Sequence, residues 1–355
     1  MIVIPSSCNA RKTCALIDYA YLALNVYHDP KDDAILGMRP AGVRSTDQIK
    51  QIINEGRHGW KQLAFPTLPR PTKNGMYAEM SVKIYKGSIH HIMVAFRGTC
   101  DWSDDKEDAK TWYKSVLAGD DAKIDLMDYW PSVVSFMVRV KNIILDLEEA
   151  NLLDTRCDSH VTGHSLGGAL ATMVVASGGL WHPAVSQMKS PLPIIPKAIS
   201  FNAPGIGAMP VRCSSEYCTG QVISLRATYD LVSAIGAPYG YVVNTDIAQG
   251  HALAKAAFES HDFKESIKKN SDNTLCNLSG ICADLEAMLP IAANTIGTSA
   301  TYSFLEQHSM DNFMQAICAH AGASAMQFLD LTIWAQAHGG LNHGEKAEPL
   351  YALAA

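Results

Sequence analysis

The sequence predicts an α/β fold with a central, mostly parallel sheet flanked by helices. A short β-branched run at residues 159–162 enters a Gly-rich turn, and residues 166–177, which contain three alanines and Met173, leave it as a helix. Two further strand-like runs follow, at 197–202 and 221–226. Strands interleaved with helices are typical of parallel sheets. We expect a single domain over residues 1–355, because α/β folds often carry insertions at this length.

The first half of the chain supplies a helix, a hairpin and a crossover helix. Apolar residues recur at helical spacing over 13–28 and again over 131–150. Between them, residues 76–96 alternate as a hairpin that turns near Gly87, while 66–73 is a Pro-rich loop. The helix at 131–150 crosses over to the next strand, as a parallel sheet requires.

Three segments are predicted as insertions over the rim of the sheet, where each is a candidate lid. Residues 101–121 are acidic and aromatic, 180–196 contain four prolines, and 279–304 are small and apolar. A solvated helix, a rigid surface loop and core packing are the respective structural alternatives. The third segment is also a candidate for contact with a lipid surface.

Composition excludes several classes of protein. Hydrophobic residues make up 48% of the chain, and no apolar run approaches the ~18 residues of a membrane-spanning helix. The net charge is −6 without a basic cluster, so we expect no nucleic-acid partner. The start lacks the pattern of a signal peptide, which predicts a cytoplasmic protein. Export by a route that needs no signal is the alternative.

The nine cysteines are irregularly spaced and include no CxxC pair, so we expect no zinc site and no cofactor. Cys213 with Cys218, and Cys276 with Cys282, could close short disulfide loops. Free thiols are favoured because no signal peptide is evident.

The most informative motif is Gly163-His164-Ser165-Leu166-Gly167, which has the spacing G-x-S-x-G between a strand and a helix. This is the sequence of a nucleophile elbow, in which the serine occupies a sharp, strained turn with its hydroxyl exposed. The two glycines keep Cβ atoms away from the tight turn. The helix N-terminus offers N–H groups to a developing oxyanion.

A serine nucleophile needs a base and a carboxylate, which should follow it in the order acid and then histidine. Asp230 follows the strand at 221–226 and would therefore lie on the same rim as Ser165. Six histidines follow Asp230. His308 precedes a predicted helix, whereas His251 lies 21 residues beyond Asp230 (251 − 230), which leaves little chain for another strand.

Several segments resemble the class 3 lipases. Residues 92–99 resemble the strand that ends in F-R-G-[ST], and residues 163–168 match G-H-S-L-G-G. Residues 200–207 and Asp230 are similar to the following strand and the acid position, while 308–313 resemble the segment that carries the base.

The resemblance implies an α/β-hydrolase fold and a catalytic triad of Ser165, Asp230 and His308, and it favours His308 over His251. It also implies an oxyanion hole formed by Thr99 and Leu166. Arg97, beside Thr99, is expected to be structural. In one departure, residues 123–130 replace the H-x-G-F segment usual in the family, which indicates a divergent member.

The function implied is hydrolysis of fatty-acyl esters of lipids, by a triacylglycerol lipase or a phospholipase of the A1 type. The expected partner is a lipid or ester substrate, and nothing in the sequence indicates a protein partner. A carboxylesterase or thioesterase for soluble esters, an exported lipase-type toxin, and a catalytically silent binding scaffold are the alternatives.

Overall fold

The structure is a computed structural model that describes residues 13–27, 59–64, 76–98, 126–178, 196–206, 220–230, 232–233, 238–247, 251–259, 306–319 and 321–337. The candidate lids at 101–121 and 279–304 lie outside these ranges, as do residues 180–195 of the second insertion and the predicted loop at 66–73. Within the described residues, no helix is both long and apolar enough to cross a membrane.

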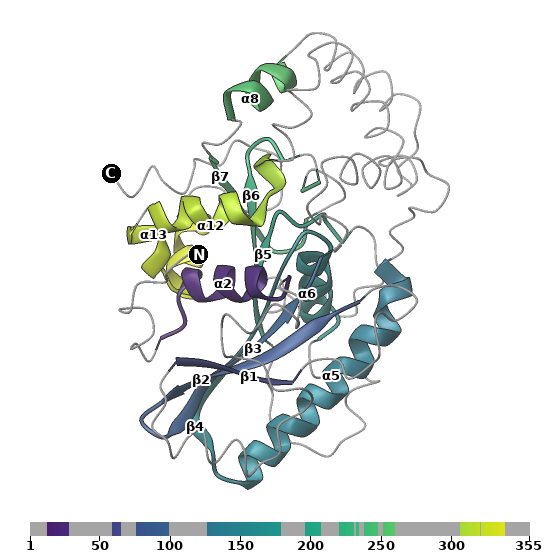
Figure 1. Cartoon of the computed structure of the whole chain (residues 1–355), viewed down its shortest axis with the longest axis vertical. Coiled ribbons are helices and arrows are strands. Elements are labelled where there is room, and N and C mark those ends of the chain that lie inside the picture. The colour runs from purple at the N-terminus through teal and green to yellow at the C-terminus, as the bar shows by residue number, and fades with distance from the viewer. Residues whose placement is uncertain are drawn as a thin grey trace.

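The described residues form a seven-stranded sheet whose spatial order follows the chain (Figure 1). Its strands are β1 (Gly59–Ala64), β2 (Ala78–Tyr85), β3 (Ser88–Phe96), β4 (Leu153–His164), β5 (Lys197–Phe201), β6 (Val222–Ala227) and β7 (Tyr241–Thr245). The pairs β1–β2 and β2–β3 are antiparallel, whereas β3 to β7 run parallel. The predicted α/β fold with a mostly parallel sheet is therefore confirmed.

The predicted hairpin is formed by β2 and β3, which turn at Lys86 and Gly87. Both residues have a positive φ, 46° and 81° respectively. Two successive positive φ angles are the requirement of a type I′ turn, whose twist matches that of the flanking strands. The second strand of the hairpin then runs beside β4 and carries the chain to Gly98.

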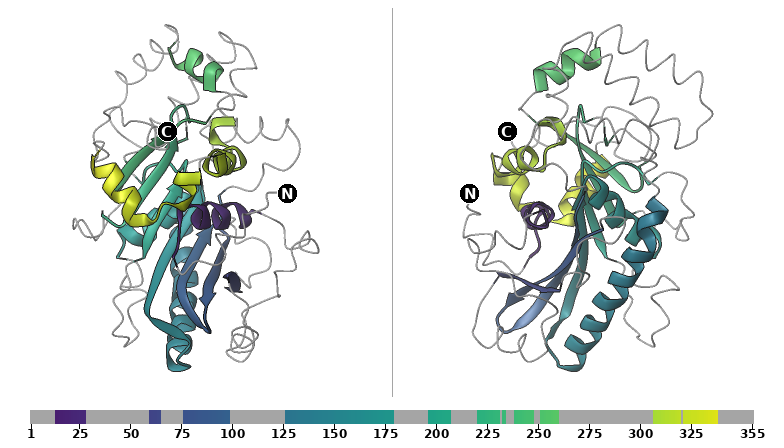
Figure 2. Two further views of the ribbon diagram at one scale, coloured as in Figure 1. Left: turned by 90° about the vertical axis from the view of Figure 1, so that its left-hand side faces the viewer. Right: turned by 45° about the vertical axis from the view of Figure 1, so that its right-hand side comes forward.

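Helices cover both faces of the sheet (Figure 2). The helices are α2 (Leu16–Asn25), α5 (Leu126–Glu149), α6 (Leu166–Ala176), α8 (His251–Glu259), α12 (Met310–Ala319), α13 (Ala321–Ala325) and α14 (Phe328–Ala337). Apolar side chains of α5 and α6 pack on one face, and those of α2, α12 and α14 pack on the other. The result is a three-layer α/β/α arrangement.

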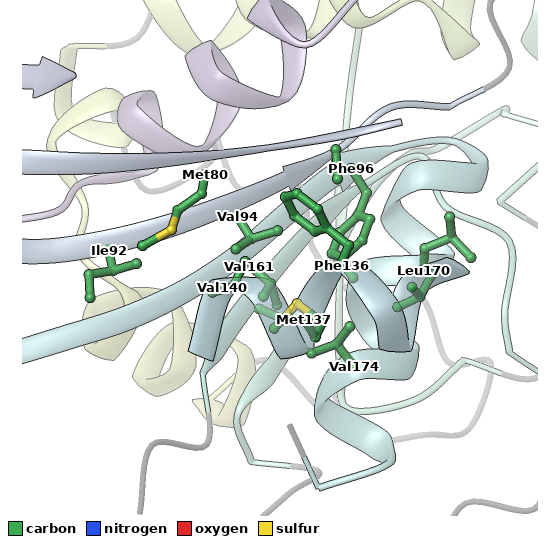
Figure 3. Close-up of a cluster of buried hydrophobic side chains, with 14 of the residues drawn as sticks. Met80, Ile92, Val94, Phe96, Phe136, Met137, Val140, Val161, Leu170 and Val174 are labelled. Atoms are coloured by element: carbon green, nitrogen blue, oxygen red, sulfur yellow. The ribbon is translucent and has the colours of Figure 1, made fainter. Parts of the chain in front are cut away.

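Alternation along β3 shows how one strand serves both cores. Ile92, Val94 and Phe96 pack toward α5 and α6, while Met93 and Ala95 face α2. In the first of these cores the rings of Phe96 and Phe136 meet edge to face, with centroids 6.4 Å apart (Figure 3). Because residues 92–96 of β3 are covered on both faces, this part of the strand is hydrophobic without a polar side. This packing fixes the end of β3 beside the nucleophile elbow.

Two elements differ from the prediction. Helix α5 begins at Leu126, five residues before Pro131, which lies inside the helix and not at its start. A proline there removes one helical hydrogen bond but does not end the helix. Strand β7 was not predicted, and it occupies part of the chain between Asp230 and His251. The expectation that this interval is too short for another strand is therefore wrong.

Candidate active site

The elbow residue Ser165 lies between the last residue of β4 and the first residue of α6. Its φ of 55° and ψ of −131° depart from the allowed regions for a residue with a side chain. The Ser165 N–H donates to the carbonyl of Phe201 on β5, at 2.9 Å, and this bond holds the turn. A strained non-glycine residue so firmly held is typical of a functional site.

Glycines beside Ser165 permit the backbone to fold this tightly. A Cβ atom on Gly163 would overlap the backbone of Gly167, and one on Gly167 would overlap the carbonyl oxygen of Phe96. A Cβ on Gly98 would lie 3.2 Å from the Cβ of Ser165. The end of β3, the end of β4 and the start of α6 therefore meet around the serine at backbone distance.

The structure brings Ser165, His308 and Asp230 together in a hydrogen-bonded row. His308 Nε2 lies 2.9 Å from Ser165 Oγ, and His308 Nδ1 lies 2.9 Å from Asp230 Oδ1. A carboxylate can only accept, so Nδ1 carries the proton and Nε2 accepts from the serine hydroxyl. This is the geometry that makes a hydroxyl nucleophilic.

The positions of the three residues follow from the sheet. Ser165 follows β4, and Asp230 follows β6 after a turn in which its N–H donates to Ala227 at 3.1 Å. Because β4 and β6 are parallel, their carboxyl ends share one edge of the sheet. His308 lies two residues before α12, which packs on α2.

Asp230 is held as an anion in a buried place. Burial alone would raise its pKa, but His308 and hydrogen bonds from Ser233 outweigh burial and lower the pKa of Asp230 below its ordinary value. The N–H groups of Val232 and Ser233 donate to its two oxygens at 3.2 and 2.9 Å. Asp230 therefore faces His308 as a charged carboxylate in a fixed orientation.

A second histidine, His164, contacts the segment that carries His308. Its Nε2 donates to the carbonyl of His308 at 2.6 Å, and the two rings lie with centroids 4.7 Å apart. Its Nδ1 accepts from the hydroxyl of Tyr27 at 2.9 Å, and that hydroxyl in turn accepts from the Gly98 N–H at 3.1 Å. These hydrogen bonds connect the turn after α2, the end of β3 and the segment that carries His308.

Burial, followed by the charge of His308, lowers the pKa of His164 to about 3. The unfolded chain binds a proton at this residue below about pH 6.5, while the folded protein does not until about pH 3. The stability that His164 contributes is therefore lost as the pH falls through this window.

We expect the free energy of unfolding to fall by about 2 kcal/mol between pH 7 and pH 5 on account of His164 alone. Denaturant unfolding at the two pH values measures this change. His164→Gln, which keeps a neutral hydrogen-bond donor, should show a pH dependence smaller by about that amount. Equal pH dependence in the two proteins would contradict the assignment.

Sequence reasoning missed Asn202, Tyr27 and Gln307. Asn202, with a φ of 47°, donates from Nδ2 to the Gln307 carbonyl at 2.8 Å and accepts from the Ala227 N–H at 2.7 Å. It therefore joins the segments that carry Asp230 and His308. Its only signal in the sequence is its place at the end of the predicted strand 197–202.

The remaining predicted site residues are placed as follows. Leu166 is the first residue of α6, where the N–H is not used within the helix. Thr99 lies outside the described residues. The guanidinium of Arg97 lies 4.6 Å from the ring centroid of Tyr77, which is consistent with a structural role. His251 begins α8 with its ring 5.0 Å from that of Tyr229, and it is His308 that lies between Asp230 and Ser165.

Among the described cysteines, Cys14, Cys157 and Cys318 take part in no disulfide. The two candidate disulfides, Cys213 with Cys218 and Cys276 with Cys282, lie outside the described residues.

Comparison with known proteins gives a family match. The model of the family described as Lipase (class 3) matches residues 41–235, which is more than half of the chain. No curated protein sequence matches.

Three solved structures illustrate a weaker similarity. A mutant form of MDLA from Penicillium cyclopium is 14% identical, with 68% of this chain and 81% of that chain covered and a TM-score of 0.40. M37 lipase is 14% identical, with 86% and 99% covered and a TM-score of 0.39. A lipase from Rhizopus microsporus var. chinensis is 16% identical, with 64% and 71% covered and a TM-score of 0.34. Similarity of this degree does not identify a function.

Proposed function

Because the chain belongs to the class 3 lipase family and is a lipase-type ester hydrolase, we propose that it cleaves fatty-acyl esters of lipids with the triad Ser165, His308 and Asp230. The observation that carries this proposal is the hydrogen-bonded row in which His308 lies 2.9 Å from both partners. Triacylglycerols and phospholipids, the latter attacked in the manner of an A1 phospholipase, are the two substrate classes in question.

In the proposed first step, Ser165 Oγ attacks the acyl carbon while its proton moves to His308 Nε2. The bond to the leaving alcohol then breaks, the alcohol takes the proton from His308, and an acyl-serine remains. Asp230 holds the imidazole in the correct tautomer and stabilises the imidazolium. In the second half a water molecule repeats the sequence, and the fatty acid and free Ser165 are released.

The negative charge on the acyl oxygen requires donors that are in place before the reaction. We assign this role to the backbone N–H of Leu166, at the positive end of the α6 dipole, and to Thr99. The proximity of Gly98 to the Cβ of Ser165 supports the second assignment, because Thr99 is the next residue in the chain.

The proposal is tested by labelling with a fluorophosphonate and by mass spectrometry of the products formed from a mixed lipid extract. We expect the label on the peptide that contains Ser165, and free fatty acid together with either diacylglycerol or lysophospholipid. His308→Gln is the matched control, since it should remove labelling while Ser165 remains present. Labelling at another residue, or an unchanged lipid extract with turnover of short soluble esters, would contradict the proposal.

A further inference from the structure

A second cluster of chemically active side chains lies on the same sheet, away from the elbow. His91 on β3 and Asp158 on β4 are register partners, and His160 follows two residues later on β4. Because side chains alternate along a strand, Asp158 and His160 point to one face. One ligand atom from each of the three residues lies within 4.8 Å of the others. The part of the chain that the structure describes holds no other group of this kind.

The two imidazoles face each other through ring nitrogens. His91 Nδ1 and His160 Nε2 are 3.0 Å apart. Two ligand atoms that each lie ~2.1 Å from a cation are separated by about 3.0 to 3.4 Å. The two ring nitrogens therefore already have the spacing of two ligands of one cation. Without a cation, a single proton between the rings must satisfy both nitrogens.

Two side chains next to the three ligands, those of Tyr19 and Lys197, hold the ligands in the orientation that a cation needs. His160 Nδ1 is 2.6 Å from the hydroxyl of Tyr19, a fully buried residue of α2. With a metal on Nε2, Nδ1 carries a proton and donates it to Tyr19, which is the usual arrangement behind a metal-bound histidine. Lys197 Nζ donates to Asp158 Oδ2 at 2.8 Å and fixes that carboxylate, while its charge weakens binding of a cation.

The site has access to solvent through its carboxylate. The side chain of Asp158 is 49% exposed and that of Lys197 is 33% exposed, whereas His160 is buried. A cation can therefore reach the buried histidines past Asp158. From His160 to Ser165 the chain advances five residues, which is roughly 16 Å along a strand, so the cluster is separate from the triad.

We propose that His91, Asp158 and His160 form a binding site for a divalent first-row transition-metal cation, with Zn²⁺ as the cation tested. Two imidazoles and one carboxylate are ligands that Zn²⁺ accepts, whereas Ca²⁺ and Mg²⁺ prefer oxygen ligands alone. Three protein ligands leave a fourth position for water. The cation would fasten β3 to β4 beneath α2, so binding should stabilise the fold.

The sequence did not predict this site, because the two histidines are 69 residues apart and only the pairing of β3 with β4 brings them together. The expectation of no zinc site rested on the absence of CxxC pairs, which says nothing about ligands on different strands.

Calorimetric titration of the chelator-treated full chain with Zn²⁺ tests the proposal, together with thermal unfolding. The wild type should bind one Zn²⁺, and Tm should rise by about 5 °C at a hundredfold excess over Kd. His91→Gln and Asp158→Asn should each weaken binding by at least about tenfold. Asp158→Asn is the safer variant for folding, because that side chain is half exposed.

His90→Gln is the matched control. His90 is the neighbour of His91 on β3 and is also buried, but it lies on the other side of the strand near Asp154, at 3.7 Å. The His90→Gln variant should bind Zn²⁺ as the wild type does. Equal affinity in the wild type, His91→Gln and Asp158→Asn would overturn the site, as would the absence of binding to a folded wild type. Fluorophosphonate labelling of Ser165 in the same samples tests the proposed hydrolysis separately. A failure of Zn²⁺ binding can therefore be distinguished from a failure of the proposed hydrolysis.

Discussion

Replacement of Ser165 by alanine is expected to lower kcat for ester hydrolysis by about 10⁴- to 10⁶-fold. In the proposed mechanism the change removes the attacking oxygen, and Asp230 and the neighbouring donors cannot replace it. The proposed oxyanion donors would remain, so a small residual rate over water is expected. Tm should change little, because the hydroxyl makes a single hydrogen bond to His308 and alanine keeps the Cβ. Initial rates on a chromogenic fatty-acyl ester measure the loss.

Ser159→Ala is the matched control for this prediction. Ser159 lies on β4, the strand that leads to Ser165, and is 8% exposed, compared with 5% for Ser165. Its kcat should stay within a few-fold of the wild type, because it lies away from the triad. Residues that act as a unit give non-additive losses, so Ser165→Ala combined with His308→Gln should be little slower than either variant alone. A Ser165→Ala variant with wild-type kcat, or a double variant whose losses multiply, would refute the triad.

The elbow could be predicted because its determinants are local. One segment of about twenty residues contains a strand, two glycines around Ser165 and a helix that starts directly after it. The structure has these elements in the same order. Asp230 could be placed for a related reason, since strand order in a parallel sheet determines which loops share an edge. Short-range pattern and simple topology were sufficient for these two residues.

His308 is a different case, because six histidines follow Asp230 and local pattern does not separate them. The resemblance to the family favoured it, while the argument from chain length against His251 was wrong, since β7 fits into that interval. A five-residue strand such as β7, with alternating burial, lies at the lower limit of what periodicity can detect.

The residues that support the triad were beyond prediction because each acts through tertiary contacts. Tyr27 meets His164 across 137 positions of the chain, and Asn202 meets Gln307 across 105. Nothing in the composition around Tyr27 or Asn202 distinguishes them from other tyrosines or asparagines of the chain. Only the packing of α2 and α12 on one face of the sheet gives these side chains their partners.

Gly167→Ala is expected to destabilise the protein by about 3 to 5 kcal/mol and to abolish labelling of Ser165. In the interior of a helix, alanine is normally favoured over glycine by about 1 kcal/mol. Here the new Cβ would overlap the carbonyl oxygen of Phe96 and lie 2.7 Å from the carbonyl carbon of Arg97. Both obstacles are backbone atoms of the chain leaving β3, so neither can rotate aside. Relief requires α6 to move away from β3, and this motion displaces the serine at its N-terminus.

Gly87→Ala separates the effect of close packing from that of removing a glycine. Gly87 has a φ of +81°, yet a Cβ there would meet nothing within 4 Å. Its substitution should therefore cost only about 1 to 2 kcal/mol of backbone strain and leave labelling intact. Denaturant unfolding of both variants gives the comparison. If Gly167→Ala costs no more than Gly87→Ala, β3 and α6 do not approach at backbone distance, and the rigid placement of Ser165 that the hydrolytic proposal requires is lost.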